Sequence, residues 1–335
     1  MDFYSTSVIR EVRSTFGRKE NWLIDMYFKK KSTVSDENII LEMKKGQNKA
    51  APFISDVENG RPIREKGRVS NVIVAPSIGV ETALTAKDIF KRPVGASQQG
   101  GPTLADRYAK RVAEILADQE NALINKEELI IAQFLTTGKV VSLEGEHPVE
   151  IDYQMPTIET LTAGNKWGEA NVDIFASIRK YVDNAEKLSG AIVNSITIGE
   201  RSASKLLNNP DLDKRLDVKN KSEAILAVVA MYPGIRYLGR LDGKVDIYSF
   251  SKQLTNAKGV VFDLIPPNIM IGGPSEGEVI YAPIIDFEEE AIYEEMRHSR
   301  NTVSKTGKQK VISTEARPVL QPCDLSAYFS VVVCD

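Results

Sequence analysis

The stretch "GGPTLADRYAKRVAEILADQENALINKEELIIAQFLTTGK", residues 100–139, decides the fold class of this chain. It opens on a Gly-Gly-Pro breaker and offers Thr103 as an N-cap, with Asp106 in the capping-box position. Apolar residues then recur at helical spacing, namely Leu104, Tyr108, Val112, Ile115, Leu116, Leu123, Ile130 and Phe134, before Gly138 provides a stop. The pattern predicts one helix over 103–134, on the order of 48 Å long and unusually long for a globular protein.

Composition bounds the class of protein. The 335 residues suggest about two domains, and 42% hydrophobic with 27% charged residues is typical of an ordinary soluble chain. No apolar run approaches the roughly 20 residues that span a bilayer, and the first residues lack the apolar core of a secretory signal. We therefore expect synthesis in the cytoplasm and no membrane partner. Cys323 and Cys334 form no disulfide framework and are predicted to be free thiols in or near a C-terminal strand.

Two segments near the N-terminus need a surface to dock on. Phe16, Trp22 and Phe28 belong to an apolar and aromatic segment that either packs on its own chain or on a neighbour. Residues 50–93 read as a long β-hairpin with an Asn-Gly turn at 59–60, and Pro76 marks a strand edge or end. A two-stranded ribbon is marginal by itself, so this hairpin also needs a partner surface.

A second unit begins near Asn171, after a short hairpin in 139–153. Helix-like 173–190, strand-like 191–199 and a capped helix in 200–216 are followed by a buried helix over 222–232. A hairpin turning at Asp242-Gly243 and further strands come next. Alternating helices and strands predict an α/β or α+β domain with a central sheet.

A basic strip in 297–322 raises the question of a partner. It contains Arg297, Arg300, Lys305, Lys308, Lys310 and Arg317 against one acid, Glu315, while the whole chain has 43 Lys and Arg against 46 Asp and Glu. Acids at 286, 288–290 and 294–295 stand just upstream, so the two blocks can pair within the chain or with a neighbouring copy. The alternative is direct binding to nucleic-acid phosphates, but a formal charge of −3 is unusual for a dedicated nucleic-acid-binding domain.

The pattern of reactive residues does not indicate an enzyme. His147 and His298 are the two histidines, and both are predicted to be surface imidazoles, so a catalytic triad or histidine metal site has almost no material. The Gly-Gly pairs at 100 and 272 open no phosphate or dinucleotide fingerprint. We therefore predict no catalytic residues, no metal site and no cofactor.

Four segments together carry a family resemblance. They are "TSVIREVRSTFGRKENWLIDMYF", "APFISDVENGRPIREKGRVSNVIVAPSIG", the spacer "LTAKDIFKRPVGAS", and the tail "EEMRHSRNTVSKTGKQKVISTEARPVLQPCDLSAYFSVVV". In this order they resemble the major capsid proteins of lambda-type tailed bacteriophages, family E. One departure is the spacer, KRPVGAS, at the base of the predicted hairpin, where family members tend to carry an acidic residue after the turn.

The resemblance implies an α+β fold of the Hong Kong 97 capsid type. It implies an N-terminal arm (1–45), an extended E-loop (46–90), a peripheral P-domain with the long spine helix (91–170), an axial A-domain (171–290) and a return to the P-domain (291–335). The function it implies is a structural head protein of the virion that assembles as hexamers and pentamers into an icosahedral shell around double-stranded DNA.

The resemblance also implies partners and contact residues. Scaffolding and portal proteins, a possible decoration protein and non-specific contact with packaged DNA are expected, besides copies of the chain itself. The residues expected at subunit interfaces are Phe16, Trp22, Phe28, Phe53, Arg61, Arg64, Glu288, Glu289, Arg297, Arg300, Lys305, Lys308 and Arg317. The alternatives are a nucleic-acid-binding protein that uses the 297–317 strip, a metabolic enzyme with a pocket after Asn171, and a tail-tube subunit, against which the long helix argues.

Overall fold

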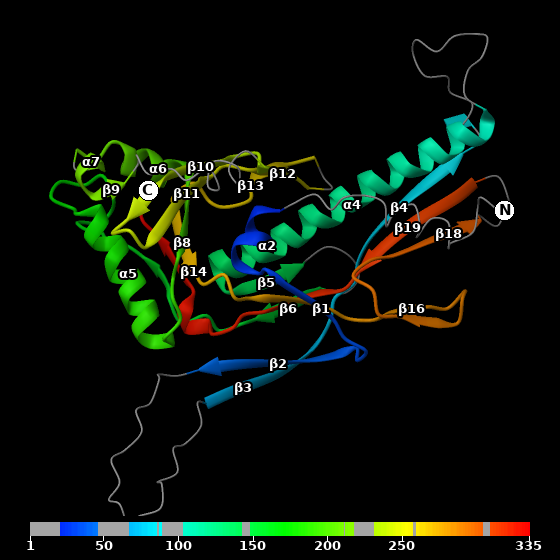
Figure 1. Cartoon of the computed structure of the whole chain (residues 1–335), viewed down its shortest axis with the longest axis horizontal. Coiled ribbons are helices and arrows are strands. Elements are labelled where there is room, and N and C mark those ends of the chain that lie inside the picture. Colours follow the sequence, from blue (N-terminus) through cyan, green and yellow to red (C-terminus); the bar gives the residue numbers. More distant parts are fainter. Residues whose placement is uncertain are drawn as a thin grey trace, which may run out of the picture.

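The computed structural model describes residues 21–45, 67–85, 87–88, 103–142, 148–210, 212–217, 231–256, 259–303 and 309–335. The described chain is elongated, and the long helix α4 runs obliquely along much of its length (Figure 1). Helices α5, α6 and α7 gather at one end of the molecule, and strands β4, β18 and β19 lie along α4 at the other (Figure 1).

The described chain contains one long helix, several shorter helices and many short strands. Its helices are α2 (Trp22–Tyr27), α4 (Leu104–Thr137), α5 (Ile174–Ser189), α6 (Glu200–Leu207), α7 (Leu212–Arg215) and the 3₁₀ turn η1 (Leu325–Ala327). Its first strands are β1 (Lys30–Thr33), β2 (Asn38–Lys45), β3 (Gly67–Val74), β4 (Ile78–Thr85), β5 (Lys139–Ser142), β6 (Val149–Asp152), β7 (Ile158–Thr160), β8 (Ser195–Gly199), β9 (Leu216–Asp217) and β10 (Ile235–Leu241). The remaining strands are β11 (Val245–Phe250), β12 (Gln253–Thr255), β13 (Val261–Asp263), β14 (Ile269–Gly273), β15 (Glu278–Tyr281), β16 (Ile284–Asp286), β17 (Ala291–Tyr293), β18 (His298–Val303), β19 (Gln309–Ala316), β20 (Pro318–Gln321) and β21 (Phe329–Val332).

The long helix begins where its sequence predicts. The Thr103 hydroxyl accepts a hydrogen bond from the backbone N–H of Asp106, and the Asp106 carboxylate accepts one from the backbone N–H of Thr103, which completes the capping box. The helix ends at Thr137, three residues beyond the predicted end, and Gly138 closes it in the left-handed conformation with φ 68°. The 34 residues of α4 therefore form one unbroken spine.

A seven-stranded mixed sheet organises the second unit. Its order is β7-β21-β14-β8-β11-β10-β9, with β8 parallel to β11 and β7 parallel to β21. Side chains alternate between its faces, as period-2 strand geometry requires: Met270 packs in the cluster with α5 and α6, whereas Ile269 and Ile271 face the cluster around α2 and α4. Both faces of the sheet are covered, so every residue of the central strands β8 and β14 is buried, including the polar Ser195 and Thr197 of β8.

The turn predicted between β10 and β11 is confirmed. Asp242 and Gly243 both have positive φ, 52° and 67°, the combination that a two-residue hairpin turn favours. The two cysteines are free thiols, as predicted, and Cys334 is buried. The helix predicted over 222–232 lies mostly outside the described residues.

The long hairpin near the N-terminus starts earlier than predicted. Strand β2 pairs antiparallel with β3, from Asn38 opposite Val74 to Lys45 opposite Gly67, so the proposed arm boundary at residue 45 falls inside a hairpin. β3 ends before Pro76 and β4 begins after it, as expected. The predicted Asn-Gly turn at 59–60 lies outside the described residues. In Figure 1 this hairpin leaves the body on the side opposite α4.

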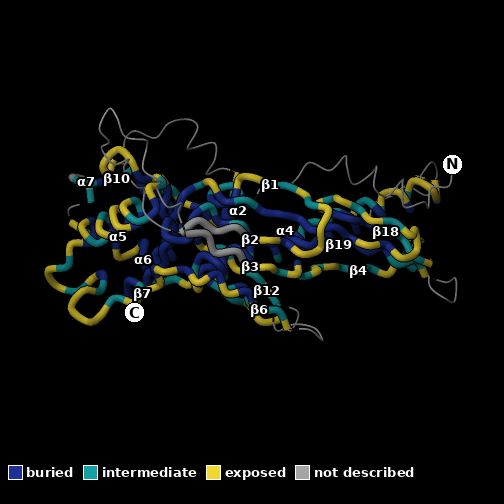
Figure 2. Tube along the Cα trace, turned by 90° about the horizontal axis from the view of Figure 1, so that it is seen from below, coloured by how far each residue is buried: buried dark blue, intermediate teal, exposed yellow. Residues whose placement is uncertain are grey.

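The aromatic segment at α2 docks on its own chain, not on a neighbour. Trp22 is 2% exposed, and Phe28 is fully buried in the cluster that contains Phe134 and Tyr328. Trp22 packs edge-on against Tyr248, with ring centroids 4.6 Å apart. Figure 2 shows this buried interior running along the middle of the molecule. The prediction that Trp22 and Phe28 form subunit contacts is therefore wrong, because the interior of one chain already encloses both rings.

Candidate assembly surfaces

A buried ion pair joins the spine helix to the return strand. The Arg297 guanidinium donates to both carboxylate oxygens of Glu127, at 2.7 and 2.8 Å, and to Glu120 at 3.3 Å. The side chains of Arg297 and Glu127 are 7% and 1% exposed. Burial acts to lower the pKa of Arg297, but the hydrogen bonds and charge of Glu127, together with the charge of Glu120, outweigh it and raise this pKa, so the guanidinium stays charged. Arg297 was predicted at a subunit interface, and the structure instead places it between two elements of its own chain.

A neutral network around Gln119 lies about two turns before Glu127 along the helix. The Gln119 amide donates to the Ile312 carbonyl at 2.7 Å and to the Thr82 hydroxyl at 3.1 Å, and it accepts from Thr314 at 2.8 Å. Thr314 also shares a 2.9 Å hydrogen bond with Ser299. Around it, apolar side chains of α4 pack against Leu84 and Ile312. The network fixes the register of the helix on the β18-β19-β4 sheet, because a shifted helix would leave buried polar groups unpaired.

His298 is buried, contrary to its prediction as a surface imidazole. It is 2% exposed, its Nε2 lies 3.0 Å from an Asp286 carboxylate oxygen, and its ring stacks on Tyr293 with centroids 4.4 Å apart. Burial raises the pKa of Asp286, but hydrogen bonds from His298 and from the backbone N–H groups of Glu288 and Glu289 outweigh it, so this pKa is lowered. The contact anchors the β16–β17 hairpin to β18.

Arg317 is a second predicted contact residue that points inward. It is 9% exposed and donates to the carbonyls of Ala75 and Pro283, and to the Glu37 carboxylate at 2.8 Å. It therefore fastens the base of the β2–β3 hairpin to the body. Two of the six basic residues of the strip, Arg297 and Arg317, are therefore unavailable for binding phosphate. Each would first have to break its hydrogen bonds to groups of its own chain.

The remaining predicted residues divide into exposed and undescribed ones. Glu288 and Glu289 are exposed at the β16–β17 turn, and Arg300 is half-buried with a hydrogen bond to the Ser313 hydroxyl. The other six residues, Phe16, Phe53, Arg61, Arg64, Lys305 and Lys308, lie outside the described residues, as does His147. Figure 1 shows β18, which contains Arg300, and the β16–β17 hairpin, whose turn contains the two glutamates, at the same end of the described molecule.

Two projecting hairpins carry large exposed apolar side chains. On β2–β3, Ile40, Val72 and Val74 are 58%, 66% and 59% exposed. On β16–β17, Phe287 is 84% and Ile292 is 65% exposed. Contiguous apolar side chains on projecting elements are typical of interaction surfaces. Sequence reasoning did not single out Phe287, Ile292, Gln119 or Glu127. The last two stand among the apolar positions of α4, where a polar residue could have signalled a buried partner.

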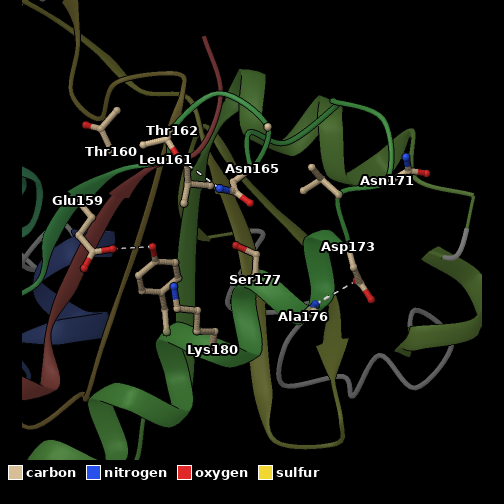
Figure 3. A pocket seen from close by; sticks show the side chains of 13 residues that line it. Glu159, Thr160, Leu161, Thr162, Asn165, Asn171, Asp173, Ala176, Ser177 and Lys180 are labelled. Carbon is tan, nitrogen blue, oxygen red and sulfur yellow. Dashed lines mark hydrogen bonds between the residues drawn. The ribbon is translucent and has the colours of Figure 1, made fainter.

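A polar pocket of about 510 Å³ lies between β7 and the start of α5 (Figure 3). The Tyr181 hydroxyl donates to Glu159 at 2.8 Å on one side, and Asp173 caps α5 through the Ala176 N–H on the other. Both carboxylates therefore have structural partners. Among the described residues, no group of three or more His, Cys, Asp or Glu side chains is placed to hold a metal ion. None of the helices in the described ranges is long and apolar enough to cross a membrane.

Comparison of the chain with known proteins identifies its relatives. It is 23% identical over 210 residues to the P21 prophage-derived major head protein of Escherichia coli O6:H1 (strain CFT073), over 61% of this chain and 60% of that protein. The match to the major capsid protein of Enterobacteria phage P21 has the same identity and coverage. This chain thus spans about 60% of the length of the curated relatives that it matches.

Solved structures give the same fold over the whole chain. The crystal structure of a prophage protein of E. coli CFT073 assigned as a capsid protein aligns over 100% of both chains, with TM-score 0.76 and 20% identity. The capsid of a native GTA particle aligns over 96% of this chain and 93% of that chain, with TM-score 0.52 and 12% identity. The predicted α+β fold of the Hong Kong 97 capsid type is confirmed. The sequence profile of the family described as "Phage major capsid protein E" matches residues 6–333, and the chain therefore belongs to that family.

Proposed function

We propose that this chain is the shell-forming subunit of a phage head, assembling as hexamers and pentamers into an icosahedral shell that encloses double-stranded DNA. The family match over residues 6–333 carries the proposal. Rings of identical subunits use heterologous contacts, in which one edge of a subunit meets a different edge of the next. Projecting hairpins with exposed apolar side chains suit such contacts, since a neighbouring copy can cover them.

We further propose that the chain is a structural protein and not an enzyme. The two carboxylates in the pocket beside Tyr181 already have structural roles, since Asp173 caps α5 and Glu159 accepts the Tyr181 hydroxyl. The nucleic-acid-binding alternative is weakened because Arg297 and Arg317 hold internal partners. Contact with packaged DNA is then non-specific, through a surface of mild charge that lets the DNA slide.

The partners follow from the shell. Scaffolding and portal proteins would direct assembly inside the host cytoplasm, a decoration protein would bind the finished shell, and the chain itself would reside in the virion. In such a shell each contact can be weak because many are made together.

Sedimentation velocity tests this proposal on the purified protein, expressed alone and with its neighbouring reading frames, across a range of salt. We expect species far larger than a 37.1 kDa subunit, with rings or closed shells by negative-stain microscopy of the same fractions. A monodisperse small particle in every condition would contradict the proposal.

A further inference from the structure

The β16–β17 hairpin has one face anchored to the body and one face turned outward. Ile284 is 2% exposed and lies opposite Tyr293, which stacks on His298, while Asp286 accepts from the same imidazole. The next pair in the ladder, Ile285 and Ile292, is 44% and 65% exposed. Because side chains alternate across a strand pair, the anchoring face fixes the outward one. The anchoring contacts therefore hold the apolar side chains of the hairpin in a defined orientation toward solvent.

The outward face is apolar at its centre and acidic around it. Phe287, at the turn, is 84% exposed beside Ile285 and Ile292. Residues 284–295 contain six acids and no base, and Glu288, Glu289, Glu290 and Glu294 are exposed. Exposed aromatic and β-branched side chains favour a covering partner, and the surrounding carboxylates require that partner to be basic.

One segment of this chain has the matching chemistry. Residues 7–19, "SVIREVRSTFGRK", combine Val8, Ile9, Val12 and Phe16 with four bases and one acid. The basic strip is the rival segment, but between Arg297 and Lys310 it contains a single aliphatic residue, Val303. It offers charge without the apolar surface that would cover Phe287.

We propose that the outward face of the β16–β17 hairpin is a docking site for residues 7–19 of a second copy of this chain. The inference rests on the proposed function, because a shell is built by contacts between copies and a contact within one chain would add nothing to it. The apolar side chains of the segment cover Phe287, Ile285 and Ile292, and its arginines meet the glutamates at the rim.

The direct test is disulfide trapping between two different variants. Phe16→Cys and Ile292→Cys are made in separate chains, each with Cys323→Ser, and are mixed under oxidising conditions. A mixed disulfide-linked dimer is expected only when both variants are present. Val260→Cys is the matched control, since Val260 is 56% exposed beside the separate β12–β13 hairpin. A mixed dimer no more abundant than with Val260→Cys would overturn the proposal, as would a Phe16→Cys/Ile292→Cys double variant that forms only an internal disulfide.

Charge exchange tests the same contact by a different property. Glu288→Lys together with Glu290→Lys changes exposed side chains only, so folding is expected to survive, and circular dichroism checks that it does. Placed in the Ile292→Cys chain, the pair is expected to reduce the mixed dimer by about tenfold, the effect of losing a favourable charge contact worth one decade of affinity. Arg10→Glu with Arg13→Glu in the Phe16→Cys chain should restore it. No reduction, or a reduction without restoration, would contradict the proposal.

The outcome separates this inference from the proposed function. If the wild-type protein forms rings or shells but the cysteine variants give no mixed dimer, the docking site is wrong and the capsid function is retained. If the protein forms no assembly in any condition, the capsid function is wrong, and formation of the mixed dimer in solution still tests the docking site.

Discussion

Arg297 and Glu127 face each other through two parallel hydrogen bonds of 2.7 and 2.8 Å, in a site where both side chains are nearly sealed from water. They are 170 residues apart in sequence: Arg297 directly precedes β18, and Glu127 lies in the C-terminal half of α4. Such a pair holds its two elements in one relative position, because any other position leaves a charge buried and unpaired.

Removing one partner is expected to be much worse than removing both. Glu127→Ala should lower the free energy of unfolding by about 3–5 kcal/mol, because it strands the Arg297 guanidinium in the interior. The double variant Arg297→Met/Glu127→Leu should regain most of that loss. Urea unfolding of the dissociated subunit measures both, and Glu114→Ala, which breaks an exposed pair with Arg111, is the control. Equal losses in the single and double variants would contradict the account.

Trp22 is predicted to stabilise the single subunit. Trp22→Ala should cost about 3–5 kcal/mol of unfolding free energy in the dissociated chain, since its ring fills a cavity against Tyr232 and Tyr248. Ile40→Ala, at a site 58% exposed, should leave that free energy almost unchanged. If Trp22→Ala impaired only assembly and left the subunit as stable as the wild type, the ring would belong to an interface after all.

The Asp286 carboxylate should make stability fall in acid. Its pKa is lowered in the folded chain, so its contribution is present above the ordinary carboxyl pKa of about 4 and is lost as the pH falls through the lower folded value. Asp286→Asn should therefore melt well below the wild type at pH 7, and the two melting temperatures should converge as the pH drops below about 4. Thermal melts followed by circular dichroism measure the gap, and a gap that stayed constant down to pH 3 would refute the mechanism.

Gly199 is expected to tolerate no side chain. A Cβ there would lie 2.3 Å from the Pro266 carbonyl oxygen and 2.6 Å from the Pro267 backbone, so β8 or the Pro-Pro segment must shift. Gly199→Ala should cost about 1–3 kcal/mol in chemical unfolding. Gly79→Ala is the control within another strand, because its Cβ would meet the nearest atom at an ordinary 3.7 Å. Equal tolerance at both positions would contradict the packing described for β8.

Local sequence signals predicted the elements whose causes are local. The capping box at Thr103 and the stop at Gly138 predicted the ends of α4 to within three residues. The Asp242-Gly243 turn was predicted because Asp and Gly are residue types that adopt the positive φ required at both positions. The family resemblance, carried by four segments in order, supplied the fold. Neither kind of signal specifies which distant side chain a given residue meets.

For that reason, the surroundings of several charged and aromatic residues were predicted wrongly. Arg297 and Arg317 stand in a basic strip, yet their partners Glu127 and Glu37 are far away in sequence and turn both guanidinium groups inward. His298 is buried against Asp286 and Tyr293 of the β16–β17 hairpin. The residues next to His298 in the sequence do not indicate that this hairpin packs on it. Trp22 packs against Tyr248 of β11, and Phe28 packs against Phe134 of α4 and Tyr328 near the C-terminus. Sequence periodicity does not predict such long-range contacts.

Electron cryomicroscopy of the largest species in the sedimentation experiment decides whether this chain builds a phage head. We expect a closed icosahedral shell of hexamers and pentamers, with the elongated chain and its oblique α4 spine occupying every subunit position. A helical tube, or a small particle whose subunits leave the β16–β17 and β2–β3 hairpins uncovered, would contradict it.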